Sequence, residues 1–365
     1  MSSVRPLARS DLPTVAEMLQ RILRKTQAPV TPALESYLAE IFLDGPHRDP
    51  EIKSHVYLRD DGRVAGFIGA LALPMVIEGK AVRGALCGTF MVDGHAEDPF
   101  AGARLMRAFL AGPQDISLTE TANDISTAMW RKLNGTVLPG YSLEWLRVLR
   151  PAEFLVEAAK GFFGAARIAS PVARLVDVFF RPGKVQSRFF SLPANTLPSE
   201  EADDQRTAAL FSRFIEPYAA RPQWEEASLR RMIAESQRKA LYGTMVRHAV
   251  TTRDGRPVGL FLYYGDPGRI GRVIQILAAP GQTGAVIDSM LAHAARRGLA
   301  ALRGRTMPTL IEAMLGQPFL FVNAGSSMVH ARDASLLEPF RAGKAFFNGF
   351  AGESWSRLIG DRFDD

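Results

Sequence analysis

The sequence is poor in cysteine and has no long uninterrupted apolar run. Its 365 residues include one cysteine, Cys87, which excludes an internal disulfide framework. The longest apolar stretch, residues 64–77, contains glycines and a proline. It falls short of the roughly 18 apolar residues that a membrane span requires, so we predict a buried strand. The opening residues, MSSVRPLARSDLP, lack the apolar region of a signal peptide, and we expect a cytoplasmic protein.

Histidine is also scarce, and it is not arranged for metal binding. The 6 histidines show no HxxxH or Cys-His spacing, so neither a structural nor a catalytic metal is expected. Cys87 lies in the strand-like run ALCGTFMV. This setting predicts a small buried hydrophobic side chain and not a nucleophile.

The charge of the chain is basic but dispersed. A net charge of +6 suits an anionic ligand, yet Lys and Arg are scattered and no nucleic-acid-binding motif accompanies them. We therefore expect a basic solvated surface and no nucleic-acid partner. Apolar content of 47% with 22% charged residues is typical of a globular protein, and 365 residues suit two domains of about 150 residues each.

Three weak internal matches occur in the same order in the two halves of the chain. HVYLRDDGRVAGF resembles HAVTTRDGRPVGL in its His, its Asp-Gly-Arg turn and a later Gly. Similar offsets between the matches predict one duplicated unit with small loop insertions. The matched segments are residues 55–67 with 248–260, 102–109 with 284–291, and 121–130 with 306–315.

The first unit is predicted to be mixed α/β, because helices come first, then a strand meander, then alternating strands and helices. Strand and helix signals are read from apolar periodicity, caps and turn residues. Strands are predicted at residues 4–8, 54–59, 64–73, 81–92, 116–119 and 141–149, and helices at 10–25, 32–42, 101–111 and 124–133.

The chain changes character after the first unit. Residues 151–185 are apolar, with basic side chains spaced seven apart at Lys160, Arg167, Arg174 and Arg181, which indicates two helices divided at Pro171. Such a basic amphipathic stretch can lie on a membrane surface or cover an acyl chain. It can also pack its apolar side on the body of the protein, and this last arrangement is the one we expect.

These signals predict three parts. Residues 1–150 form the first domain and residues 207–365 form the second, with helices expected at 207–220 and 224–239 before the second strand meander. Residues 151–206 are a helical interdomain segment followed by an exposed loop rich in Pro, Ser, Glu and Asp.

Three segments of the first half carry a family resemblance. They are residues 4–19 (VRPLARSDLPTVAEML), 90–105 (FMVDGHAEDPFAGARL) and 116–135 (ISLTETANDISTAMWRKLNG). In order, they resemble the first strand and helix, the glycine-rich RxxGxG/A loop, and the NxxAxxLYxxxGF segment of the GNAT (Gcn5-related N-acetyltransferase) superfamily of acyl-CoA-dependent N-acyltransferases. The repeat extends the resemblance to residues 240–350, giving a tandem two-domain protein similar in architecture to mycothiol synthases.

The resemblance implies two α/β domains, each a mostly antiparallel sheet with a splayed pair of parallel strands, flanked by helices. It implies acetyl-CoA or another acyl-CoA as co-substrate, and no metal. A helix N-terminus offers unpaired N–H groups to a pyrophosphate. The residues at this position are Ala101, Gly102, Ala103 and Arg104 in the first copy and residues 281–284 in the second, and the small ones among them would let the backbone approach the phosphates. In the first copy Glu97 and Asp98 face the expected phosphates.

The helix after the fifth strand separates the two copies. Asn123 stands at the family's Asn, whereas Trp130 replaces the tyrosine that commonly protonates the departing CoA thiolate, and we expect both to contact the cofactor. In the second copy Pro308 and Leu315 occupy these positions. Tyr141 is a candidate substitute for the missing acid.

An amine that attacks a thioester needs a base for its proton and fixed donors for the oxyanion. The resemblance assigns the donors to backbone N–H groups near Met91 and Val92, and Phe90 joins them in the predicted cofactor site. Glu120 and Asp93, at the ends of the fifth and fourth strands, are the candidate bases.

The predicted function is acyl transfer, with acetyl as the expected group, from CoA to a small-molecule amine by direct attack. The first copy is expected to hold CoA because it keeps Asn123. The aromatic segment 346–355 either lines the substrate cleft or is buried against the strands. An alternative is a decayed tandem protein that binds CoA, a metabolite or a protein partner without turnover, and a third reading has residues 151–185 covering a long acyl chain.

Overall fold

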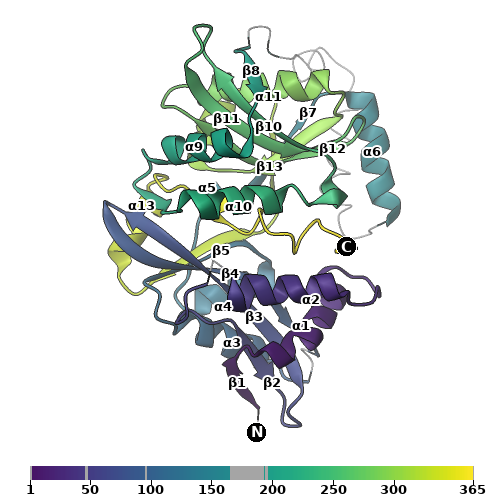
Figure 1. The fold of residues 1–365 in the computed structure, drawn as a ribbon, viewed down its shortest axis with the longest axis vertical. Helices are drawn as coiled ribbons and strands as arrows, with labels where there is room; N and C mark the ends of the chain where they lie inside the picture. Colours follow the sequence, from purple (N-terminus) through teal and green to yellow (C-terminus); the bar gives the residue numbers. More distant parts are fainter. Residues whose placement is uncertain (1, 46–47, 95–96, 165–192, 194–195, 365) are drawn as a thin grey trace.

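The structure is a computed structural model, and it describes residues 2–45, 48–94, 97–164, 193 and 196–364. Two mixed sheets lie one above the other along the long axis of the molecule, and the C-terminal segment runs between them (Figure 1). Helices flank both sheets, which confirms the predicted α/β class with two domains of this type.

The first sheet contains eight strands among the described residues; seven follow one another in the sheet, and the eighth, β9, pairs antiparallel with the end of β3. In spatial order they are β1 (Ser3–Pro6), β2 (His55–Leu58), β3 (Val64–Ile77), β4 (Lys80–Val92), β5 (Ile116–Ala122), β15 (Ser326–Ala331) and β6 (Thr136–Val137), with β9 (Ala220–Pro222) beside β3. The predicted strand over residues 64–77 is therefore confirmed.

The second sheet has the same plan. Its seven strands in the described part are β8 (Ser199–Glu201), β10 (Met245–Thr251), β11 (Pro257–Tyr264), β12 (Ile270–Ala278), β13 (Ala301–Arg305), β7 (Leu143–Val148) and β14 (Leu320–Asn323). Position by position, this order matches the order of the first sheet, as a duplicated unit predicts.

The helices follow the strands in corresponding places. The first half has α1 (Leu12–Met18), α2 (Pro32–Ala39), α3 (Ala101–Leu110), α4 (Asp124–Lys132), α5 (Pro139–Ser142) and α6 (Pro151–Gly164). The second half has α9 (Asp204–Ile215), α10 (Glu226–Ser236), α11 (Thr283–Arg296), α12 (Pro308–Met314) and α13 (Glu338–Arg341). Short helical turns η2 (Leu19–Leu23), η4 (Ala240–Tyr242) and η6 (Gly349–Ala351) complete the site described below.

Local sequence explains where several of these elements begin and end. Thr31 caps α2 by accepting the N–H of Leu34, and Pro32 follows at the first helical position, where its missing N–H is no loss. The hairpin between β3 and β4 turns at Glu78 and Gly79, both with positive φ, as tight hairpin turns require.

The two halves exchange one strand each. The strand predicted over residues 141–149 forms as β7, but it pairs with β13 and β14 of the second sheet. In return β15, near the end of the chain, lies between β5 and β6 of the first sheet. Each sheet therefore contains one strand from the other half of the chain. Two independent domains that meet at residue 150 would not share strands in this way. The division at residue 150 stays a prediction.

Of the predicted interdomain segment, the structure describes α6, and residues 165–192 lie outside the described part. Phe154 of α6 is buried in a small cluster with Val148 and Ala301, and Ala158 packs against it. The described part of the segment therefore packs on the second sheet. Within the described residues, no helix combines the length and apolarity needed to cross a bilayer.

Candidate functional site

The parallel strands β4 and β5 of the first sheet separate to form a fork. They pair from Gly84 with Ile116 to Leu86 with Leu118, and their ladder ends there. Beyond this point β4 also carries a bulge against β3 between Phe67 and Gly69. A bulge increases local twist and redirects side chains, so β4 turns away from β5 where the fork opens.

A cavity of about 670 Å³ fills this fork, and this volume is typical of small-molecule sites, which run to roughly 300–1,000 Å³. Its walls come from both halves of the chain. They include Cys87, Thr89 and Phe90 of β4, Thr119, Thr121 and Ala122 of β5, Asn123 and Ser126 at the start of α4, Leu19, Gln20, Leu23 and Arg24 of the first helical region, Leu241 and Tyr242 of η4, and Glu353, Leu358, Ile359, Gly360, Asp361, Arg362 and Asp364.

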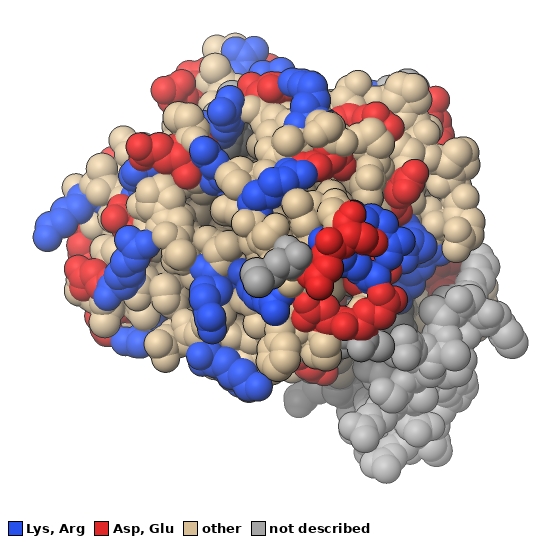
Figure 2. All heavy atoms as spheres, turned by 90° about the horizontal axis from the view of Figure 1, so that it is seen from below, with Lys and Arg blue, Asp and Glu red and all other residues tan. Residues whose placement is uncertain are grey.

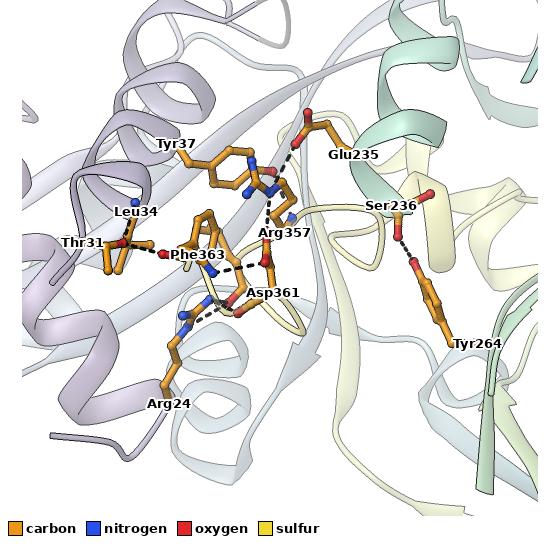
Figure 3. Close-up of polar contacts among 11 residues, drawn as sticks. Arg24, Thr31, Leu34, Tyr37, Glu235, Ser236, Tyr264, Arg357, Asp361 and Phe363 are labelled. Atoms are coloured by element: carbon orange, nitrogen blue, oxygen red, sulfur yellow. Dashed lines mark hydrogen bonds and ion pairs between the residues drawn. The ribbon is translucent and has the colours of Figure 1, made fainter. Parts of the chain in front are cut away.

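Residues 345–364, which we call the C-terminal segment, form the wall of the cavity that faces the fork. The far end of this segment is tied to both halves (Figure 3). Arg24 donates to the carbonyls of Leu358 and Asp361, at 3.1 and 3.0 Å. The Thr31 hydroxyl donates to the carbonyl of Phe363 at 2.8 Å. These bonds fix the wall against the end of η2 and the start of α2.

Arg357, itself part of the C-terminal segment, holds the end of that segment in place. Its guanidinium pairs with Asp361 and lies 3.9 Å from Glu235 of α10. It also sits over the rings of Tyr37 and Phe363, at 5.1 and 4.7 Å from their centroids. A buried charge with this many partners orders the chain around it.

The corresponding fork of the second sheet is filled by the protein itself. Strands β12 and β13 pair only from Ile270 to Val273, and the space beyond retains a cavity of about 20 Å³. Asn348 and Gly349 line this small cavity, and the backbone N–H of the next residue, Phe350, donates to the side chain of Gln275 on β12 at 3.2 Å. The C-terminal segment therefore plugs the second fork and lines the first.

Gly349 allows this close approach. It has φ of +65°, and a Cβ there would lie 2.3 Å from the carbonyl oxygen of Ile274. We expect Gly349→Ala to lower the free energy of unfolding by about 1–2 kcal/mol, through the positive φ and the clash. Thermal melting checks this. A Cβ at Gly284 meets nothing within 4 Å, so Gly284→Ala is the matched control; equal melting of both variants would contradict the plug.

The structure places the candidate base Glu120 at the fork but turned away from the cavity. It is fully buried, and its two carboxylate oxygens accept the N–H groups of Gly349 and Glu353, each at 3.0 Å. The hydroxyl of Ser354 lies 3.1 Å from one of these oxygens. In this arrangement Glu120 anchors the C-terminal segment on β5.

Asp93 and Tyr141 lie away from the cavity walls. Asp93 forms a two-bond pair with Arg21, at 2.8 and 2.9 Å, and this pairing lowers the pKa of its carboxyl. Tyr141 is buried, and its hydroxyl donates to the carbonyl of Ala345 at 2.9 Å. Burial raises the pKa of that hydroxyl. Their predicted roles as base and acid remain predictions.

The two carboxylates of the loop before α3 are bound by neighbouring side chains. Glu97 pairs with Arg59, and Asp98 accepts from the Tyr57 hydroxyl and lies 3.3 Å from Arg104. The two acidic residues that sequence placed beside the expected phosphates are therefore already paired. On the face of the molecule seen from below, basic and acidic side chains are interspersed (Figure 2).

The predicted cofactor residues divide into two groups. Phe90 and Asn123 line the cavity, and Asn123 also caps α4 by accepting the Ser126 N–H at 2.9 Å. Trp130 is fully buried and packs edge-on against Phe109, with ring centroids 6.3 Å apart. It lies in the core behind the cavity.

The remaining predicted cofactor residues sit around α3 and at the end of β4. Met91 is buried and Val92 half-buried, both beyond the bulge. Gly102 is buried, and a Cβ there would lie 3.3 Å from Met129 and 3.4 Å from Phe90. The start of α3 thus adjoins the Phe90 wall. Ala101 and Ala103 flank Gly102 in the first turn of the helix.

Glu353 is a cavity residue that sequence reasoning missed. Its carboxylate accepts the Thr121 hydroxyl of β5 at 2.9 Å, and the backbone N–H of Thr89 on β4 is near enough to lower its pKa. A Cβ at Gly88 would lie 2.8 Å from its other oxygen, so the group spans the mouth of the fork. Within the described residues, no cluster of three or more His, Cys, Asp or Glu is arranged to hold a metal.

No family model matches the chain, and no curated protein matches it in sequence. Solved structures with a similar fold were found. A protein of Enterococcus faecalis, described as of unknown function and a probable N-acyltransferase, aligns over 92% of this chain and 74% of its own, with a TM-score of 0.59 and 7% identity.

Two further structures have the same fold. A GCN5-related N-acetyltransferase of Anabaena variabilis covers 92% of this chain and 74% of its own, with a TM-score of 0.59 and 11% identity. One of Kribbella flavida covers 92% and 72%, with a TM-score of 0.55 and 12% identity. Since each alignment spans both sheets, the fold predicted from sequence is confirmed for nearly the whole chain.

Proposed function

Because the chain has the fold of the GCN5-related N-acetyltransferases, we propose that it is an acyl-CoA-dependent N-acyltransferase. The acyl group, acetyl in the simplest case, passes from the CoA thioester to the amine of a small molecule. Fold alone does not assign this activity. The observation that carries it is the open fork between β4 and β5, with a cavity of about 670 Å³ between the strands.

The site of the thioester is proposed to be the first fork. A pantetheine arm that entered between the separated strands would meet unpaired backbone groups of both strands, which suit its amides. Phe90 and Asn123 line this space, and the start of α3 beside Phe90 is the proposed position of the pyrophosphate. The second fork is lined by Asn348 and Gly349 of the C-terminal segment, and its cavity measures only about 20 Å³.

Titration calorimetry with acetyl-CoA, CoA and a long-chain acyl-CoA tests the proposal. We expect micromolar binding, lost at least tenfold in Gly102→Glu, which puts an anion where the phosphates are proposed to lie. Gly102→Ala controls for the packing against Phe90, and Gly284→Glu makes the same change in the second copy, where a Cβ has open space. Both controls should bind like the unmodified chain.

Each other outcome has a definite meaning. Loss of binding only in Gly284→Glu would move the cofactor to the second copy. Failure of every CoA species to bind would overturn the acyltransferase proposal. Binding without turnover of any amine would favour the alternative of a decayed CoA-binding module, and tighter binding of the long-chain species would assign a long acyl group in place of acetyl.

A further inference from the structure

Glu353 occupies a position that the proposed reaction requires to be filled by a base. It reaches the fork from the C-terminal segment, where its carboxylate accepts the hydroxyl of Thr121 on β5 and lies near the backbone N–H of Thr89 on β4. These contacts come three residues past the last paired residues of β4 and β5, Leu86 and Leu118. The carboxylate thus lies where the two strands separate, on the wall of the cavity.

The backbone of Glu353 is held as firmly as its side chain. Its own N–H donates to the buried carboxylate of Glu120 at 3.0 Å. The hydroxyl of the next residue, Ser354, donates to Glu120, and its carbonyl accepts from the ammonium of Lys239. Gly352 precedes it, where a Cβ would lie 2.0 Å from Glu120. The carboxylate is therefore presented to the cavity by a fixed support.

Charged groups around Glu353 favour its protonated form. Burial, and after it the nearby Glu120 carboxylate, raise the pKa of this carboxyl, whereas Thr121 and Lys239 lower it, and the resulting pKa is about 7. Cys87 on β4 also faces it, and burial raises the pKa of that thiol. A carboxylate that exchanges its proton near neutrality is suited to accept one from an ammonium and release it to water.

From this geometry we infer that Glu353 is the general base of the acyl transfer, a role that rests on the proposed function. The Glu353 carboxylate takes one proton from the acceptor ammonium. The freed nitrogen lone pair forms a bond to the thioester carbon, the carbon–sulfur bond breaks, and the thiolate leaves. The second proton lost by nitrogen neutralises the thiolate. The sum is ammonium plus acyl-CoA giving amide, CoA thiol and one proton.

The rim of the cavity is apolar, and this property suggests which amine to use in the test. Leu23, Leu241 and Ile359 line it and remain 45%, 54% and 48% exposed. These three side chains would cover an apolar body attached to the reacting nitrogen. Benzylamine is the corresponding probe, since it joins an apolar ring to an amine that is almost wholly ammonium at neutral pH.

Release of CoA from acetyl-CoA with two nucleophiles tests the inference in the intact chain. Benzylamine must lose a proton before it attacks, whereas hydroxylamine is largely neutral at pH 7. We expect Glu353→Gln to slow the benzylamine reaction about 100-fold or more and the hydroxylamine reaction no more than a few-fold. Glu312→Gln, the same change at an exposed site of α12, should leave both rates unchanged.

The pH profile and stability give independent readouts. The unmodified chain should show kcat/KM for benzylamine rising through about pH 7, a limb absent in Glu353→Gln. Because the folded-state pKa lies above the value of 4.5 usual for Glu, ionisation costs stability as pH rises from about 4.5 through 7. Glu353→Gln removes that cost, so its melting temperature at pH 8 should equal or exceed that of the unmodified chain.

Three results would overturn the inference. An unchanged benzylamine rate would show that Glu353 takes no proton. An equal loss with both nucleophiles would assign it a structural role. Bound acetyl-CoA with no turnover by the unmodified chain would instead remove the proposed function, and the base with it.

Discussion

Glu120→Gln is expected to lower the free energy of unfolding by about 3 kcal/mol and to abolish turnover. Each oxygen of this buried carboxylate accepts one backbone N–H, from Gly349 and from Glu353. A carboxamide has only one acceptor oxygen, so its NH₂ group must face one of those N–H groups. The C-terminal segment then loses its anchor on β5. Denaturant unfolding measures the loss, with Glu312→Gln as the control.

This prediction separates two roles for Glu120. The sequence assigned it as a candidate base, and a base that only exchanges protons could be replaced by glutamine without loss of stability. If Glu120→Gln kept the melting temperature of the unmodified chain and lost kcat at unchanged KM, the catalytic assignment would stand and the anchoring role would fall.

Residues 1–150 expressed alone are expected not to form a folded domain. The fragment keeps β7, which belongs to the second sheet, and lacks β15, which pairs with β5 and β6. Without β15 one edge of β5 is left unpaired, and an open apolar sheet edge is unstable and prone to aggregate. We expect no cooperative thermal transition and poor dispersion of its amide NMR signals.

A matched experiment distinguishes the missing strand from the broken chain. Residues 1–164 coexpressed with residues 193–365 contain every described strand, and we expect the two pieces to purify together and to melt cooperatively. A cooperative transition of residues 1–150 alone would instead support an independent first domain, as the sequence-based division assumes.

The sequence located most local elements because these depend on neighbouring residues. The turn at residues 60–63 and the apolar run of residues 64–77 both act within a few positions of the chain. The strand at residues 143–148 was found for the same reason. Its partner was not, since a strand of given apolarity can pair with either of two similar sheets, and only the whole fold decides which.

Sequence predicted the site residues that lie within short segments resembling the family, and it missed the residue that reaches the site from a distant part of the chain. Phe90 and Asn123 were expected near the cofactor and do line the cavity. Glu353 reaches Thr121 across 232 positions of sequence, and no periodicity connects them. The one available signal was the aromatic segment around it, which sequence alone left open between cleft lining and burial; the structure shows both, with Phe350 buried and Glu353 on the cavity wall.

The strand exchange also sets an order of events during synthesis. Strand β5 is complete at Ala122, but its partner Ser326 emerges about 200 residues later, which at about 5–20 residues per second is roughly 10–40 s. During that interval the edge of β5 that pairs with β15 has no partner strand. The cavity, whose first wall is translated early and whose last wall reaches Asp364, is completed only after the C-terminal segment has been synthesised. A prematurely terminated chain should therefore have no site at all, rather than half of one.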